Sequence, residues 1–155
     1  MSRSFLLRKK LIEGRLEIRV IGVSAEMLLK RKHSLEDAIS LLERGLAKVR
    51  MAKNIVESSR GKVDRLLVLS AFSGFPISSH AMASVYLSSS MKDVSKALKI
   101  LMKIYRRTQS VSLAKIIDNL RNLANANTAE EYESRLESVI NELRDLMGKI
   151  GNLSV

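Results

Sequence analysis

Residues 34–67 read SLEDAISLLERGLAKVRMAKNIVESSRGKVDRLL, and their apolar side chains recur with a seven-residue period. The first apolar position of successive heptads is filled by Leu35, Leu42, Val49, Val56 and Val63, and the second by Ile39, Leu46 and Leu67. This spacing places the side chains along one stripe of an α-helix, which is the pattern of a coiled-coil seam. Because such a stripe has to be buried, the stretch predicts a helical partner from the same chain, from a second copy, or from both.

The two ends of this stretch carry different signals. Ser34 offers a side-chain acceptor for an N-cap, and Glu36 and Asp37 place negative charge in the first turn, so the helix is expected to begin at Ser34. Lys53 and Arg60 occupy the two second positions that are not apolar. We therefore expect the far half of the seam to face a partner with acidic groups or backbone acceptors.

The composition limits the fold class. The chain has 155 residues, enough for one domain, and no Cys, which excludes catalytic thiols, disulfides and thiolate metal sites. Aromatic residues make up 4% of the chain, so the core has to be built from Leu, Ile, Val and Met. Such a core suits helix seams, and we predict an all-α fold in which a long antiparallel, coiled-coil-like hairpin carries a shorter acidic C-terminal helix packed back on it.

The charge is unevenly distributed. The formal net charge is +11; residues 1–110 hold 22 Lys and Arg against 9 Asp and Glu, whereas residues 111–155 hold 5 against 7. A basic body of this kind attracts phosphate, either of anionic lipid head groups or of nucleic acid. The charge alone does not choose between the two.

Residues 1–33 form a basic N-terminal segment. On a helix its apolar residues would be flanked by cations and could lie in a bilayer interface. The same residues also share the spacing of the later seam, which favours a helix packed on protein, and the alternation over residues 15–20 allows a short strand. The candidate membrane- or phosphate-binding cations of this segment are Arg3, Arg8, Lys9, Lys10 and Arg15.

The predicted hairpin core covers residues 34–127. Gly74 and Pro76 end the first helix, and Ser78 and Ser79 can cap a second one that runs to about residue 123, with a loosening at 108–110. The seam of the second helix includes Met91, Val94, Leu98 and Leu101. Its outer side is expected to carry the candidate phosphate-binding residues Lys92, Lys96, Lys99, Lys103, Arg106 and Arg107.

Residues 128–155 form the acidic C-terminal helix and tail. Thr128 and the acids Glu130 and Glu131 provide a cap and dipole-compensating charge at its start. Its apolar stripe comprises Tyr132, Leu136, Ile140, Leu143 and Met147. We expect this helix to fold back on the basic hairpin.

Taken together, a basic hairpin followed by an acidic helix resembles the ESCRT-III family, most closely its archaeal cell-division form, CdvB. Residues 64–67 (DRLL), 83–86 (ASVY) and 94–96 (VSK) with Lys99 are similar to the family motifs Asp-x-x-Leu, Ala-x-x-Tyr-Ala and Ile-Arg-Lys-x-x-Lys. The chain departs from the family pattern at residues 88–90, where serines replace Asn-Glu, and at its Gly-Phe-Pro tip, so it resembles a divergent member.

The resemblance implies a filament-forming subunit that binds anionic membranes and remodels or constricts them. It also implies further copies or related paralogues as partners and recruitment of an AAA ATPase. No apolar run approaches the roughly 20 residues of a membrane span, and the N-terminal segment lacks the apolar core of a secretory signal, so we expect a cytoplasmic location, at the membrane surface. The candidate docking residues for that ATPase are Glu133, Leu136, Ile140, Leu143 and Arg144, with Val139 in place of the motif's Arg.

Two other classes of function fit the sequence less well. A nucleic-acid-coating protein, of chromatin or viral nucleocapsid type, would use the same cations, but the sequence shows no aromatic platform for single strands and no compact helix-turn-helix signature with a short recognition helix. An enzyme is not predicted, because His33 and His80 lack spaced carboxylates and no Gly-rich phosphate loop is present. We therefore predict no cofactor, no metal site and no catalytic residue.

Overall fold

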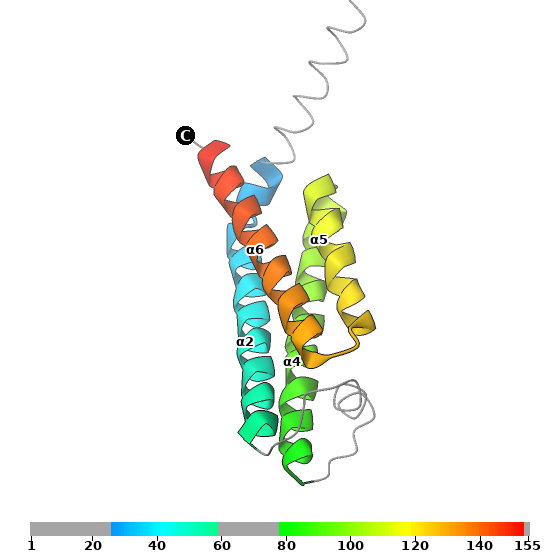
Figure 1. Ribbon diagram of the computed structural model, residues 1–155. Coiled ribbons are helices and arrows are strands. Elements are labelled where there is room, and N and C mark those ends of the chain that lie inside the picture. The colour runs from blue at the N-terminus through cyan, green and yellow to red at the C-terminus, as the bar shows by residue number, and fades with distance from the viewer. Residues whose placement is uncertain (1–25, 59–77, 154–155) are drawn as a thin grey trace, which may run out of the picture.

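The computed structural model describes residues 26–58 and 78–153, and all the regular structure of these residues is helical (Figure 1). This confirms the all-α prediction. A helical turn over residues 26–29 precedes the main elements. These are α2 (Lys32–Ser58), α4 (Ser78–Thr108), α5 (Val111–Arg121), the 3₁₀ helix η1 (Asn122–Asn125) and α6 (Ala129–Leu153).

The four α-helices form an antiparallel bundle (Figure 1). The helix contacts run from α2 to α4, from α4 to α5, from α5 to α6, and from α6 back to α2. This order closes a ring in which α4 and α6 lie on the diagonal. The direction of the chain alternates along the ring, as in an up-down-up-down four-helix bundle. The α2–α4 hairpin is the most extensive contact, and α6 packs back on it, as predicted.

Small side chains bring α2 and α4 close together. Ser90 lies against Gly45, where its Oγ donates to the Gly45 carbonyl oxygen over 2.7 Å. In this antiparallel register Ala38 comes opposite Ala97, and Ala52 opposite Ala83. All these residues are buried and recur every seven positions on their helices. A second heptad stripe of Ala, Gly and Ser therefore lets the two backbones approach along the hairpin.

The predicted seam is the core of this bundle. Leu35, Leu42, Val49 and Val56 are at most 1% exposed, and they belong to one cluster with buried residues of the other three helices. Burying a side chain of this size is worth roughly 1.5–3 kcal/mol. In α4, Val94 and Leu101 are buried, whereas Met91 and Leu98 are half-buried. The helical partner predicted for the seam thus comes from the same chain.

The second hairpin helix ends earlier than predicted. The expectation of one helix running to residue 123 is wrong, because α4 ends at Thr108 and the chain turns back. Gln109 has a φ of 53°, in the left-handed region that ends helices. Ser110 then caps α5, with its Oγ accepting from the Leu113 amide over 3.3 Å. The loosening predicted at residues 108–110 is a complete reversal, which converts a long rod into two antiparallel helices.

The starts of α2 and α6 can be compared with the sequence signals. α2 begins at Lys32, and the Leu35 amide donates to the Arg31 carbonyl over 3.0 Å, so Ser34 lies inside the first turn and the predicted start is wrong by two residues. The start of α6 is as predicted. Thr128 Oγ1 accepts from the Glu131 amide over 3.1 Å, and the Glu131 carboxylate accepts from the Asn127 amide over 3.0 Å.

Several predictions fall outside the described residues. They are the N-terminal cations of residues 1–25, the end of the first helix with Arg60, Val63 and Leu67, the motif at residues 64–67, and the tip at residues 73–76.

Candidate functional site

Six cations of α4 share its outer side, as the sequence predicts. Their spacing of three, four or seven residues keeps them on one face of a helix, over a length of roughly 22 Å. All six are exposed, and none forms an ion pair with a carboxylate of residues 26–58 or 78–153. We call this set the α4 row: Lys92, Lys96, Lys99, Lys103, Arg106 and Arg107.

The carboxylate nearest in sequence to the α4 row is turned inward. Asp93 is 4% exposed and accepts from Lys48 Nζ of α2 over 2.6 Å. Lys48 also donates to Ser89 Oγ over 2.7 Å. After Asp93 the chain has no acidic residue until Asp118. The positive potential of the α4 row is therefore not cancelled by acids of its own helix.

A series of ion pairs connects α2 to α6. Glu133 accepts from Lys53 Nζ over 2.6 Å and from Arg50 Nε over 3.0 Å. Arg50 also lies 3.7 Å from Glu137, and Arg144 pairs with Glu43 further along the same two helices. The expectation that the far half of the seam would meet an acidic partner is confirmed at Lys53, whose partner is the C-terminal helix.

The ion pairs at Glu133 shift the pKa values of both partners. Burial alone would raise the pKa of Glu133, but the hydrogen bonds from Lys53 and Arg50 outweigh it and hold this pKa below its ordinary value. The hydrogen bond to Glu133 raises the pKa of Lys53, against a smaller effect of burial. Both charges are stabilised by the contact.

The acidic helix leaves the α4 row open. Its carboxylates contact Arg50 and Lys53 of α2, while α4 lies on the diagonal of the bundle. Folding of α6 onto the hairpin therefore covers the apolar seam rather than the six cations of the α4 row.

The candidate ATPase-docking residues belong to the interface between α6 and the rest of the bundle. Leu136, Ile140 and Leu143 are at most 2% exposed, and Glu133 and Arg144 form the ion pairs described above. In this conformation a partner could reach these residues as a set only if α6 left the bundle.

Sequence reasoning missed a polar layer inside the bundle. Ser90 is fully buried, and Tyr132 of α6 is 2% exposed with a hydroxyl that has no hydrogen-bond partner. Burial raises the pKa of Tyr132 to about 12; the nearby Ser90 hydroxyl, which lies outside hydrogen-bond geometry, opposes this in part, and the charge of Asp93 adds to it. Ser90 could have been found from its seven-residue spacing to Ala83 and Ala97, but Tyr132 reads in the sequence as one more apolar stripe residue.

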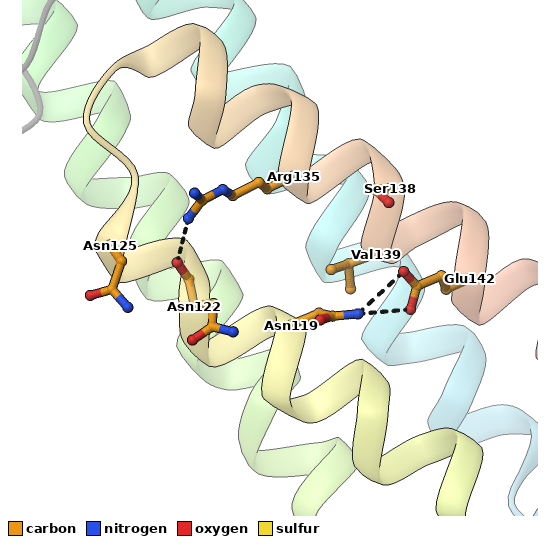
Figure 2. Close-up of a pocket in the computed structure, with 7 residues that line it drawn as sticks. All are labelled: Asn119, Asn122, Asn125, Arg135, Ser138, Val139 and Glu142. Carbon is orange, nitrogen blue, oxygen red and sulfur yellow. Dashed lines mark hydrogen bonds between the residues drawn. The ribbon is translucent and has the colours of Figure 1, made fainter.

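Two surface grooves flank α6. One, of about 420 Å³, lies between α6 and the α5–η1 segment (Figure 2). In it Asn119 Nδ2 donates to both carboxylate oxygens of Glu142, over 3.3 and 3.2 Å, and Arg135 Nη1 donates to the Asn122 carbonyl over 3.0 Å. The other, of about 440 Å³, lies between α2 and α6 beside the half-exposed Met51. The polar contacts of the first groove hold α6 on α5.

Within residues 26–58 and 78–153, no three His, Cys, Asp or Glu residues are grouped to hold a metal ion. The His33 side chain is 99% exposed and lies 3.7 Å from Glu36. None of the described helices is long and apolar enough to cross a bilayer.

Comparisons with protein-family models, with curated proteins and with solved structures gave no match to this chain. The resemblance to ESCRT-III stays a prediction that rests on the sequence motifs.

Proposed function

We propose that this chain is a membrane-remodelling subunit of the ESCRT-III type. It binds anionic bilayers through the α4 row and assembles with further copies or paralogues through its helix seam. The observation that carries the proposal is the α4 row itself, six exposed cations on one helix face without described acidic partners. Each Lys or Arg held near an anionic membrane surface contributes about 1 kcal/mol.

Membrane binding and assembly make different demands on α6. The α4 row is accessible with α6 in place, so binding needs no rearrangement. Assembly through the seam does, because residues such as Leu42 and Val49 are already buried within the chain. The α2–α6 ion pairs then act as a clamp on assembly, and displacement of α6 would also expose the candidate ATPase-docking residues.

The test is sedimentation with phosphatidylcholine vesicles that contain phosphatidylserine. The triple variant Lys103→Gln, Arg106→Gln, Arg107→Gln should bind about a hundredfold more weakly, since three contacts of about 1 kcal/mol each are lost. The matched control removes three exposed cations of the other helices: Arg44→Gln, Arg121→Gln and Lys149→Gln. It should weaken binding far less.

Two outcomes would overturn the proposal. If the triple variant and its control lose the same affinity, the membrane responds only to net charge and not to the α4 row. If duplex or single-stranded DNA binds more tightly than the vesicles at physiological salt, through the same three cations, the chain is a nucleic-acid-coating protein instead.

A further inference from the structure

The corner between α4 and α5 exposes an apolar side chain at the capped start of a helix. Val111, the first residue of α5, is 73% exposed, the highest value among the exposed large hydrophobic residues of the described chain. The left-handed Gln109 and the Ser110 cap fix the turn directly before it. Val111 therefore lies at the capped N-terminal end of a folded helix.

Cations surround this corner. Arg106 and Arg107 are exposed in the last turn of α4, and Lys115 is exposed one turn beyond Val111 on the same face of α5. From residue 94 to residue 117 the chain contains six cations and no acid. The first carboxylate on this face of α5 is Asp118, roughly 10 Å along the helix from Val111.

We propose that this corner is the part of the molecule that enters an anionic bilayer. Val111 reaches between the head groups, while Arg106, Arg107 and Lys115 hold lipid phosphates around it. This inference rests on the proposed membrane binding. It adds the orientation of the bundle, which meets the membrane with the α4–α5 corner first. An apolar side chain within a ring of cations matches a lipid interface, where hydrocarbon lies directly beneath phosphate. A nucleic-acid backbone offers the phosphate without the hydrocarbon.

A second exposed residue distinguishes this orientation from a flat one. Val85 is 61% exposed and precedes Lys92 and Lys99 at seven-residue spacing, so it lies on the same face of α4 as the α4 row. A bundle lying flat on α4 would bring both Val85 and Val111 to the membrane. A bundle that meets the membrane with its corner brings only Val111.

The chain contains no Trp, so a single introduced Trp reports its own surroundings. We would prepare Val111→Trp, Val85→Trp and, as a control on α6 across the bundle, Asn141→Trp. Each is mixed with phosphatidylserine-containing vesicles whose acyl chains are brominated. For Val111→Trp we expect a blue-shifted emission and quenching at least threefold stronger than at the other two positions.

The outcomes separate this inference from the proposed function. Equal quenching at positions 85 and 111 means flat binding and overturns the corner-first orientation. Sedimentation without quenching at position 111 means contact with head groups only and overturns the insertion. Absence of sedimentation overturns the proposed function together with this inference.

A second measurement does not depend on Trp. Val111→Ser should weaken vesicle binding about three- to tenfold, the range expected for loss of a partly buried Val side chain. The matched variant Val85→Ser should change it less than twofold, with both proteins checked for folding by circular dichroism. Equal effects of the two variants would contradict a special role of Val111.

Discussion

Ser90 Oγ donates a hydrogen bond to the carbonyl oxygen of Gly45 over 2.7 Å, and this contact lies at the centre of the α2–α4 hairpin. A Cβ atom added to Gly45 would lie 3.2 Å from Ser90 Oγ and 3.4 Å from the Ser90 carbonyl oxygen. The two residues are therefore coupled: the small size of one sets the space available to the other.

A double-mutant cycle measures this coupling. Gly45→Ala gains about 1 kcal/mol of helix propensity but presses on the buried hydroxyl, and Ser90→Ala loses a buried hydrogen bond worth about 1 kcal/mol. In the Ser90→Ala background the hydroxyl no longer opposes the added methyl group. We expect Gly45→Ala to be more favourable there, by about 1 kcal/mol in the free energy of unfolding in urea, and additive effects would contradict the coupling.

Gly45 and Ser90 also show how much of the fold the sequence could predict. The Leu and Val heptad predicted the all-α hairpin, and the acids at the start of α6 predicted its cap. The small-residue heptad was missed because Ala, Gly and Ser have no hydrophobic signal of their own. The reversal at Gln109 was missed as well, since Gln is not a typical left-handed residue and the stripe continues in phase into α5.

The candidate site, like the fold, was predictable from the sequence only in part. Exposure of the α4 row followed from helical periodicity alone, because the pattern of the core fixes the outer face. The pairing of Glu133 with Lys53 and Arg50 could not be assigned to particular residues, since it depends on the register of two helices 80 residues apart in sequence. The exposed Val111 depends on the complete reversal at Gln109, where the sequence predicted only a loosening of the helix.

The buried hydroxyl of Tyr132 predicts a stabilising substitution. Tyr132→Phe removes a hydroxyl that has no partner, so we expect the free energy of unfolding at pH 7 to rise by about 1 kcal/mol. Tyr105, which is partly exposed, provides the matched control Tyr105→Phe. A destabilised Tyr132→Phe protein would mean that the hydroxyl has a partner in solution.

The same residue predicts a pH dependence. The pKa of Tyr132 is about 12 in the folded chain and 10.0 for a free Tyr, so the unfolded state releases its proton first as the pH rises. Stability contributed by the neutral phenol is complete below pH 10 and is lost between the two pKa values, by about 1.4 kcal/mol at pH 11. The advantage of Tyr132→Phe over the wild type should grow by that amount from pH 8 to pH 11 in urea unfolding, and a constant difference would contradict this.

The Glu133 contact predicts the opposite dependence in acid. Its pKa is held below the ordinary value of 4.5, so the stability that it contributes is present above that pH and is lost as the pH falls through the lower folded value. Glu133→Gln should cost about 1 kcal/mol at pH 7, and the cost should shrink as the pH falls below 4.5 and the wild-type carboxyl takes up its proton. The exposed Asp145, which has no described ion pair, provides the control Asp145→Asn, and a Glu133→Gln cost that stays constant as the pH is lowered would argue against this account.

Locking α6 onto α2 should separate membrane binding from assembly. Glu43 and Arg144 pair across the two helices with side chains 43% and 57% exposed, and the chain has no Cys of its own. In Glu43→Cys, Arg144→Cys a cleavable bifunctional maleimide can therefore join α2 to α6 specifically. We expect the linked protein to bind anionic vesicles within twofold of the unlinked one, because the α4 row stays open. It should form no polymers by electron microscopy until the linker is cleaved, because the seam stays covered.

A linker within α2, in Ser40→Cys, Arg44→Cys, is the control and should leave assembly unchanged. Polymers formed by the α2–α6-linked protein would show that copies associate through the outside of the closed bundle, so that α6 does not act as a clamp.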